Sequence, residues 1–349
     1  GCGPLPPASV KVPNLGPAPR AAREILRTHA SHTLKGPAMP DLILHHYPMS
    51  PFAEKIRLVL GYKKLAWKSV IIPRVMPKPD VVALTGGYRR TPVLQIGADI
   101  YCDTALICDV LEHRQPSPSL YPQGSNGAVR IVAQWADSTL FWAAMGYSFS
   151  PAGAAFIFQG DAPEVAKAFA EDRAKMRAGA SRMHPGDATS AYKSYLRRIA
   201  SMVDNQPYVM GQQPSLADFS CYHALWFTRR IPPLAGIFDA TPSLSVWMGR
   251  MAAFGQGSME QSDALAAIAV AAQSKPAGVE KEVFQDDHGI ALGSRVTVTA
   301  ESFGLEPTEG ELVAATRTRY SLRRSDARAG TVHVHFPRVG YQLRAVKPT

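Results

Sequence analysis

Three short motifs in the first third of the chain could together bind and activate a thiol. The first, Ser50-Pro51, separates an apolar run, residues 42–47, from an amphipathic run, residues 52–60. Ser is a favoured N-cap and Pro is favoured at the first helical position, so this pair predicts the start of a helix. The Ser50 hydroxyl would then lie beside unpaired backbone N–H groups at the positive end of the helix dipole, where a thiolate is stabilised. A plain helix cap is the alternative interpretation.

The other two motifs stand at the predicted starts of a strand and of a helix. Pro92, in Thr91-Pro92, marks a strand edge, a strand start or a cis bond, because proline is poorly tolerated inside sheets. A cis bond would turn the backbone N–H and C=O of Val93 outward, toward the peptide unit of a ligand. Asp103-Thr104 would open the next helix, where a carboxylate can bind an ammonium and a hydroxyl can bind a carboxylate. An ordinary N-cap is the simpler alternative for Asp103.

The elements around these motifs predict an α/β domain over residues 41–114. Their order is strand, helix, strand, irregular link, two strands and helix, which is typical of a thioredoxin-like domain with mixed strand pairing. Disulfide exchange at the first helix is excluded, because Ser50 and Ala53 stand where a redox pair would need cysteine. The four cysteines of the chain are scattered without a CxxC motif, which indicates a reducing compartment and no zinc site.

A proline-rich linker, residues 115–124, leads into an all-helical region, residues 125–273. Ser215 and Asp218 form a capping-box pattern before an apolar helix that must be buried, so Asp218 is expected to be structural. Trp142 is expected in the core. The aromatic residues within 148–158 would line a ligand pocket or pack between helices.

These motifs resemble the glutathione transferase superfamily. The run Tyr47-Pro48-x-Ser50-Pro51-Phe52-x-x-Lys55-x-Arg57 looks like its serine-type signature, and Thr91-Pro92-Val93-Leu94 looks like its cis-proline segment. Asp103-Thr104 stands where the family more often has Glu-Ser or Gln-Ser. The run 215–219 resembles the capping box of the family's buried helix. The resemblance covers residues 41–273.

The resemblance implies a role for each of these residues. Ser50 would be catalytic, because it would bind and help ionise the glutathione thiol, and the Val93 backbone would pair with the cysteinyl unit. Asp103 and Thr104 would hold the γ-glutamyl end. A cation or amide within 74–90 would bind the glycine carboxylate, with the choice left open. The residues expected to form the glutathione site around Ser50 are Tyr47, Phe52, Thr91, Pro92, Val93, Asp103 and Thr104.

The remaining residues, 274–349, lie outside the resemblance and predict a small all-β domain with short strands over 294–300, 310–316 and 331–336. His333 and His335 fall on one face of a strand, but no third metal ligand is evident, so no metal site is predicted. The arginine-rich run over 317–328 is expected to be a solvated turn, with an anion or nucleic-acid contact as the alternative.

The net charge of +10 is concentrated at the ends of the chain. Residues 1–40 carry +4 and residues 312–349 carry +7, so the body between them is close to neutral. This distribution argues against a nucleic-acid partner. No apolar run reaches the roughly 18 residues of a membrane span. Residues 1–40, with eight prolines, are expected to be a flexible leader, with Met39 as a candidate natural start and a transit peptide as the alternative.

We therefore expect a thioredoxin-like α/β domain, an all-α helical domain and a small all-β domain. The expected function is that of a cytoplasmic, homodimeric glutathione transferase in detoxification, with glutathione as co-substrate, a small hydrophobic electrophile as second substrate, and no metal. Two alternatives remain open. One is a non-catalytic binding or regulatory module with the same fold. The other is a glutathione-dependent isomerase or dehalogenase. A buried Ser50 hydroxyl would argue against the enzymatic interpretations.

Overall fold

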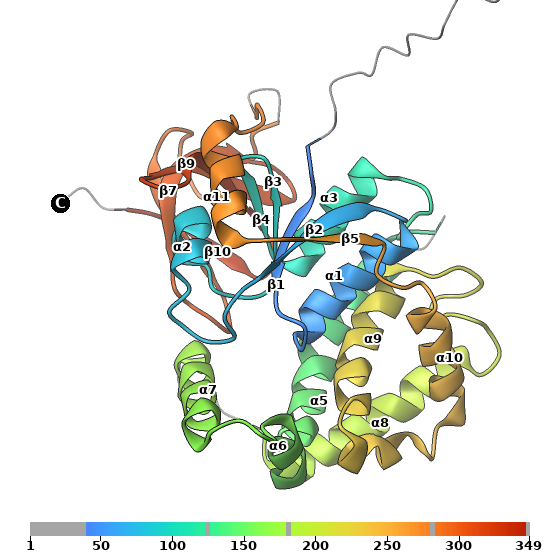
Figure 1. Ribbon diagram of the computed structural model, residues 1–349. Coiled ribbons are helices and arrows are strands. Elements are labelled where there is room, and N and C mark those ends of the chain that lie inside the picture. The colour runs from blue at the N-terminus through green and yellow to red at the C-terminus, as the bar shows by residue number, and fades with distance from the viewer. Residues whose placement is uncertain (1–39, 123–125, 179–182, 280–282, 347–349) are drawn as a thin grey trace, which may run out of the picture. The chain divides into compact units, whose positions relative to one another are not determined.

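The computed structural model describes residues 40–122, 126–178, 183–279 and 283–346. Almost all of the predicted leader lies outside these residues. In the described part, ten strands form one mixed sheet in the order β10-β6-β7-β8-β9-β4-β3-β1-β2-β5 (Figure 1). The strands are β1 (Ile43–His46), β2 (Ala66–Ile71), β3 (Val93–Ile96), β4 (Asp99–Cys102), β5 (Ser258–Ser262), β6 (Arg295–Ala300), β7 (Thr308–Ala315), β8 (Arg319–Asp326), β9 (Gly330–Pro337) and β10 (Tyr341–Ala345).

Strands β1 to β4 form the sheet of the expected thioredoxin-like domain. β1 is parallel to β2 and antiparallel to β3, which in turn is antiparallel to β4, so the mixed pairing is confirmed. The helices of this part are α1 (Pro51–Tyr62), α2 (Pro79–Thr85) and α3 (Thr104–Arg114). The apolar positions of α1 face inward with Leu42 and Leu44, and they belong to the same core as the helical region. The thiols of Cys102 and Cys108 are free and buried.

A helical region follows the linker, but the interval 125–273, predicted to be all helical, also contains strand β5, which pairs with β2. Its helices are α4 (Asn126–Trp135), α5 (Phe141–Ser148), α6 (Pro151–Ile157), α7 (Pro163–Arg177), α8 (Pro185–Val203), α9 (Leu216–Arg229) and α10 (Pro242–Ala252), with a π-helical turn η3 (Ala136–Leu140) and a 3-10 helix η4 (Pro232–Phe238). The capping box of Ser215 and Asp218 is present, and α9 is buried along most of its length. Asp218 also accepts hydrogen bonds from Val209 N–H and Trp247 Nε1, which confirms its structural role. Trp142 was wrongly expected in the core, since it is 39% exposed.

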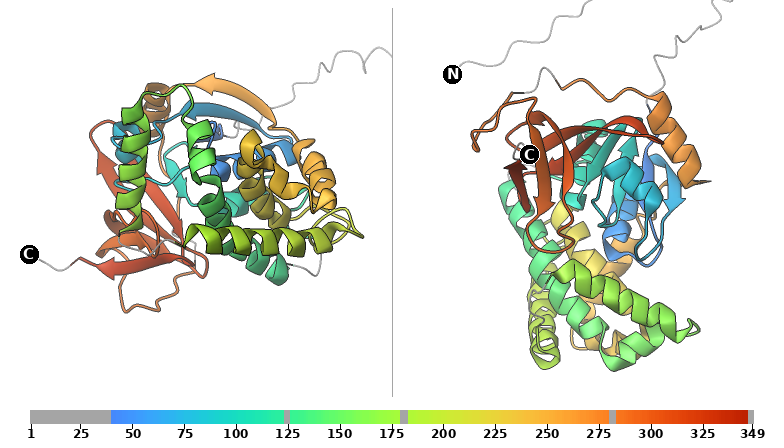
Figure 2. Two further views of the ribbon diagram at one scale, coloured as in Figure 1. Left: turned by 90° about the horizontal axis from the view of Figure 1, so that it is seen from below. Right: turned by 90° about the vertical axis from the view of Figure 1, so that its left-hand side faces the viewer.

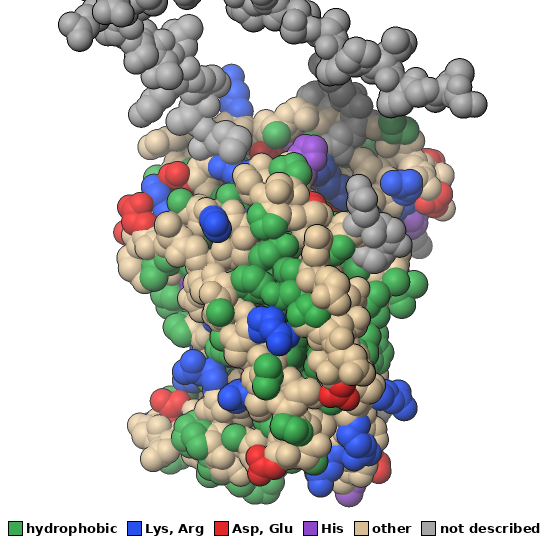
Figure 3. Space-filling model, turned by 90° about the vertical axis from the view of Figure 1, so that its right-hand side faces the viewer, with side chains coloured by type: hydrophobic (Ala, Val, Ile, Leu, Met, Phe, Trp, Pro, Cys, Tyr) green, Lys and Arg blue, Asp and Glu red, His purple; other side chains and the backbone are tan. Residues whose placement is uncertain are grey.

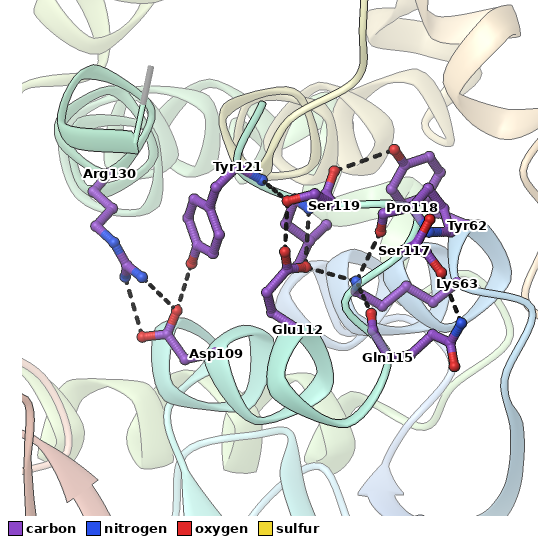
Figure 4. A network of polar contacts seen from close by, with 11 residues as sticks. Tyr62, Lys63, Asp109, Glu112, Gln115, Ser117, Pro118, Ser119, Tyr121 and Arg130 are labelled. Atoms are coloured by element: carbon purple, nitrogen blue, oxygen red, sulfur yellow. Dashed lines mark hydrogen bonds and ion pairs between the residues drawn. The ribbon is translucent and has the colours of Figure 1, made fainter. Parts of the chain in front are cut away.

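The linker is held against the thioredoxin-like part by a polar network around Lys63 (Figure 4). The Lys63 ammonium, at the end of α1, donates to Glu112 Oε2 at 2.6 Å and to the carbonyls of Gln115 at 2.6 Å and Pro118 at 2.9 Å. Glu112 in turn accepts from the Ser119 hydroxyl at 2.5 Å. The ammonium is buried and has three oxygen partners. These contacts therefore fix the path of the linker into the helical region.

The predicted C-terminal β region is present, and it continues the sheet of the thioredoxin-like part. β9 pairs in parallel with β4, so β6 to β10 extend the sheet beyond β4 (Figures 1 and 2). The two parts also share a second core, which includes Val93, Ile100, Val334 and Phe336. Helix α11 (Ala264–Gln273) contributes Ile268 and Ala271 to this core. The β region therefore packs against β3 and β4.

The arginine-rich run was wrongly expected to be a solvated turn, because residues 319–326 form strand β8. Its side chains alternate along the strand and meet acidic or carbonyl partners. Arg323 pairs with Glu311 of β7 at 2.5 Å, Arg324 donates to the Ala83 carbonyl of α2, and Arg328, in the following turn, pairs with Asp80 at 2.5 Å. The alternation of side chains along this strand could not be recognised in the sequence, because the run contains consecutive arginines, which are uncommon in strands.

A buried polar relay joins β4 to the C-terminal β region. His335 Nε2 lies 2.9 Å from Asp99 Oδ1, and its Nδ1 lies 2.8 Å from the Ser321 hydroxyl. Asp99 Oδ2 accepts from the Ala277 N–H at 2.8 Å. All three side chains of the relay are buried. His333, the other histidine on this face of β9, has its Nδ1 4.0 Å from Asp99 Oδ1. The two histidines of β9 therefore connect the C-terminal β region to β4 of the same sheet.

Replacing the central acceptor of this relay should weaken the fold. Asp99→Ala removes the carboxylate that lies against the buried His335 ring and accepts from the Ala277 N–H, so the free energy of unfolding should fall by about 1–3 kcal/mol. Urea unfolding followed by circular dichroism measures this change. The matched control is Glu309→Ala, which removes an exposed carboxylate of β7 paired with Arg295 and should change stability by less than about 1 kcal/mol. Equal unfolding midpoints for the two variants would contradict the structural role of the relay.

Candidate functional site

The three predicted motifs meet at one end of the sheet because of the directions of their strands. β1 ends at His46, four residues before Ser50. β3 runs antiparallel to both neighbours, with Val93 in register with His45 of β1 and Cys102 of β4. The start of β3 therefore lies between the ends of β1 and β4, and Ser50, Thr91-Pro92 and Asp103 all leave the sheet at this edge. The sequence predicted the motifs, and the strand register brings them together.

Ser50 caps α1. Its Oγ accepts a hydrogen bond from the Ala53 N–H at 3.2 Å, and Pro51 occupies the first helical position. This is the only hydrogen bond of Ser50 Oγ among the described residues, so its proton is left to donate to a ligand. The residue is 2% exposed, which means that its hydroxyl is enclosed by protein. The capping role is thus confirmed, and a catalytic role would require a thiol to reach a hydroxyl that protein encloses.

The Thr91–Pro92 peptide bond is cis, as one of the sequence alternatives proposed. Val93 follows it as the first residue of β3 and is buried between two neighbouring strands. The Thr91 hydroxyl, on the outer side of the cis bond, lies 3.3 Å from the ammonium of Lys78. The Lys78 ammonium and the start of β3 are therefore adjacent in the candidate site.

Lys78 is a site residue that the sequence did not single out. Its ammonium also lies 3.4 Å from the Arg89 carbonyl and 5.9 Å from the centre of the Tyr47 ring. Burial lowers the pKa of this ammonium to about 8, with a smaller contribution from Arg173. Lys78 has no acidic partner within ion-pair distance among the described residues.

The other cations in the predicted interval already have partners. Arg74 pairs with Asp161 at 3.1 Å, Arg89 pairs with Asp172 and Glu306, and Arg90 donates to the Phe303 carbonyl. Nothing in the sequence distinguishes Lys78 from these arginines, since its selection depends on partners far along the chain.

Asp103 caps α3 in an unusual backbone conformation. Its φ is +75°, in a region that few residues other than glycine adopt, although Asp is among the more tolerant types. Its Oδ1 accepts from the Ala105 N–H at 2.9 Å, which confirms the N-cap. The side chain remains about one-quarter exposed, at 25%. Strained, partly exposed caps of this kind are found at ligand sites, so the carboxylate is a candidate anchor for a cation.

A charged cluster around Lys55 contacts Thr104 from the interior of the protein. The ammonium of Lys55, on α1, donates to Thr104 Oγ1 at 3.2 Å and to Asp137 Oδ2 at 2.5 Å. Asp137 Oδ1 accepts from His223 Nε2 at 3.0 Å. Because Thr104 Oγ1 accepts from Lys55, the Thr104 proton is directed elsewhere and can be donated to a carboxylate. Sequence analysis did not find Asp137 and His223, because they come from distant helices.

The charges in this cluster are set by burial and by their mutual attraction. Burial opposes the charged form of Lys55, but Asp137 outweighs this effect and the net result is a raised pKa. Burial likewise opposes ionisation of Asp137, but Lys55 and His223 lower the pKa of this carboxyl overall. Burial lowers the pKa of His223, which is therefore neutral and donates through Nε2.

Tyr47 and Phe52 lie on different sides of the α1 start. The Tyr47 ring faces Lys78, and its carbonyl accepts from the Ser50 N–H at 3.1 Å. The Phe52 ring packs against Phe141 and His223 of the helical region, with ring centres 4.6 and 4.5 Å away. Phe52 therefore connects the site to the helical region.

The described residues contain neither a grouping of three or more His, Cys, Asp or Glu side chains suited to a metal ion nor a helix long and apolar enough to cross a bilayer. On the face shown in Figure 3, lysine and arginine side chains are dispersed among acidic and polar ones, and hydrophobic side chains form a band down its middle. This face carries no continuous basic patch of the kind that binds a polyanion.

Removing the Lys55 charge should destabilise the fold. Lys55→Met leaves Asp137 ionised and largely buried without its cation, so the free energy of unfolding should fall by about 3–5 kcal/mol. Adding Asp137→Asn, which removes the stranded charge but keeps an acceptor for His223, should restore at least half of that loss. Urea unfolding of both variants tests this expectation. A Lys55→Met variant as stable as the wild type would show that the pair is not coupled as described.

Comparisons with known proteins agree with this geometry. The glutathione S-transferase N-terminal domain family matches residues 44–119, and the glutathione S-transferase C-terminal domain family matches residues 140–254. A solved structure of a glutathione transferase-like protein from Pseudomonas syringae is 42% identical, covers 88% of this chain and 100% of its own, and superposes with a TM-score of 0.74.

Two curated relatives are more distant. Pyrimidodiazepine synthase of Drosophila melanogaster is 31% identical over 106 residues, which are 28% of this chain and 43% of the fly protein, so the match spans less than half of that relative. FtsZ-localized protein A of Caulobacter vibrioides is 23% identical over 182 residues, which are 51% of this chain and 72% of the bacterial protein. With both domain families matched in order and the Pseudomonas protein covered in full, the chain belongs to the glutathione transferase superfamily.

Proposed function

We propose that this protein is a glutathione-dependent transferase whose thiol site lies at the start of α1. The observation that carries the proposal is the meeting of four ligand-binding groups at one sheet edge. They are the free proton of Ser50, the cation of Lys78, the carboxylate of Asp103 and the hydroxyl of Thr104. Glutathione has a thiol, two carboxylates and one ammonium, so its groups and those of the site are complementary in charge.

Each group has a defined part in this proposal. Asp103 binds the γ-glutamyl ammonium, and Thr104 donates to the γ-glutamyl carboxylate. The backbone at Val93 pairs with the cysteinyl unit, and Lys78 binds the glycine carboxylate. The two carboxylates would thus be held by a hydroxyl on α3 and by a buried ammonium before α2, with the thiol directed toward Ser50.

The proposed chemistry is nucleophilic attack by the glutathione thiolate. A Ser50 hydrogen bond and the α1 dipole would lower the thiol pKa, and a shift of two units corresponds to about 2.7 kcal/mol. The sulfur forms a bond to an electrophilic carbon, the leaving group departs with its electron pair, and the thiol proton passes to solvent. We propose a small hydrophobic electrophile as the second substrate, and a cytoplasmic homodimer as the active form.

A non-catalytic glutathione-binding module is the second candidate. The observation that favours it is the 2% exposure of Ser50, because an enclosed hydroxyl serves the helix cap without meeting a thiol. Both candidate functions include glutathione binding, but only the transferase catalyses conjugation. Retention on immobilised glutathione without conjugation of an aromatic electrophile would support the module.

Ser50→Ala should separate a catalytic hydroxyl from a simple cap. Turnover with glutathione and a generic aromatic electrophile should fall more than tenfold, because the thiolate loses its donor. Stability should fall by about 1 kcal/mol from the lost cap. The measurements are conjugation rate and urea unfolding.

Asp263→Ala is the matched control for cap loss. Asp263 caps α11 by accepting from the Ala266 N–H at 2.8 Å, in a part of the chain that the proposed site does not use. This variant should show a similar loss of stability with unchanged turnover. Unchanged turnover in Ser50→Ala would reject the catalytic role, and binding without any wild-type turnover would favour the module.

The affinity of Lys78 for the glycine carboxylate should depend on pH. Because burial holds the pKa of Lys78 near 8, its ammonium is charged at pH 7 and loses its proton as the pH rises through that value. Wild-type affinity for S-methylglutathione, which has no titrating thiol, should fall by up to about tenfold between pH 7 and pH 9. Isothermal titration calorimetry at each pH measures this affinity.

Lys78→Arg is the control, since arginine stays charged over this range. Titration of the ligand's own amine affects both proteins equally, so the difference between their pH profiles isolates residue 78. Parallel profiles would show that Lys78 does not bind the carboxylate.

A further inference from the structure

The C-terminal β region places a tyrosine on the proposed glutathione site. Tyr341 is the first residue of β10 and pairs in register with Ala300 of β6. Its hydroxyl donates to Asp103 Oδ2 at 3.0 Å and lies 3.3 Å from the Tyr88 hydroxyl. The side chain is buried, at 4% exposed. A residue nearly 240 positions along the chain thus contacts the carboxylate at the start of α3.

The Tyr341 hydroxyl is a permanent donor. Burial and the charge of Asp103 raise the pKa of this phenol well above its usual value, so it stays protonated at neutral pH. Asp103 therefore has a fixed donor on each oxygen, the Ala105 N–H on Oδ1 and Tyr341 on Oδ2. Each oxygen still has a lone pair, and a quarter of the side chain's surface is exposed.

Arg90 forms a long ion pair with the same carboxylate. Its guanidinium lies over the Tyr341 ring, 5.7 Å from the ring centre, and its Nη1 is 3.9 Å from Asp103 Oδ2. Its Nε donates to the carbonyl of Phe303, in the segment between β6 and β7. That segment is itself fixed by the Gly304 N–H, which donates to the Met176 carbonyl at 2.7 Å, and by the Phe303 ring against Trp142.

These contacts decide where the Asp103 carboxylate can point. Without the Tyr341 hydroxyl, the carboxylate has one fixed donor fewer and a guanidinium nearby, so it would turn toward Arg90 and close the ion pair. A carboxylate paired in this way is less available to the ammonium of a ligand.

We propose that Tyr341 is a positioning residue, through which the C-terminal β region orients Asp103 toward the γ-glutamyl ammonium of glutathione. This inference rests on the proposed function, because it assumes that glutathione binds at Asp103. The β region would then be part of the binding site for the γ-glutamyl end, and not only an extension of the sheet.

The test uses two ligands and two variants of the full chain. The ligands are glutathione and its analogue without the α-amino group, which cannot use Asp103. Tyr341→Phe should raise the Kd for glutathione about tenfold and leave the Kd for the deaminated analogue unchanged. The matched control is Tyr320→Phe, which removes the hydroxyl of another buried tyrosine of this β region and should leave both values unchanged.

The outcomes separate this inference from the proposed function. No wild-type binding of glutathione would reject both. Wild-type binding with unchanged affinity in Tyr341→Phe would overturn the inference and leave the function standing. An equal loss of affinity for both ligands would show a general structural effect and also overturn it. Tighter glutathione binding in Tyr341→Phe would mean that Tyr341 competes with the ammonium, which contradicts a positioning role.

Discussion

The direction of three adjacent strands is the constraint on which the candidate site depends. β1 and β4 end, and β3 begins, at the same edge of the sheet, so the segments that carry Ser50, Thr91 and Asp103 leave it side by side. Strand pairing is set by backbone hydrogen bonds along whole strands, so a shift by one residue would turn every side chain of β3 to the other face. Val93 and Leu94 are buried, which makes that shift unfavourable. Their packing therefore fixes the strand register and, with it, the geometry of the site.

Two hydroxyls of the candidate site accept hydrogen bonds from neighbouring groups, so their protons remain available for donation. Lys55 donates to Thr104 and thereby leaves the threonine proton available, and the Ala53 N–H does the same for Ser50. Burying a charge such as that of Lys55 is unfavourable unless it is paired, and Asp137 and His223 supply that pairing from the helical region. The helical region therefore contributes to the electrostatics of a site formed by the α/β part.

The C-terminal β region is joined to the same framework by three kinds of contact. Backbone pairing of β9 with β4 extends the sheet, a shared apolar core includes Val93 and Phe336, and buried polar groups link Asp99 with His335. Together these contacts fix β10 relative to α3, which is why the hydroxyl of Tyr341 can reach Asp103. A loosely attached domain could not hold one hydroxyl at 3.0 Å from one carboxylate.

The sequence by itself determined the elements and the motifs that have local causes. Ser50-Pro51 and the capping box of Ser215 and Asp218 act within one helical turn, so residue types at short spacing were sufficient to predict them. Only the tertiary structure decided which cation lacks an acidic partner among the described residues, because Arg74, Arg89 and Lys78 differ in partners that lie far along the chain. It also showed that the arginine-rich run is strand β8 and that Tyr341 lies on Asp103, since long-range strand pairing leaves no short-range pattern in the chain.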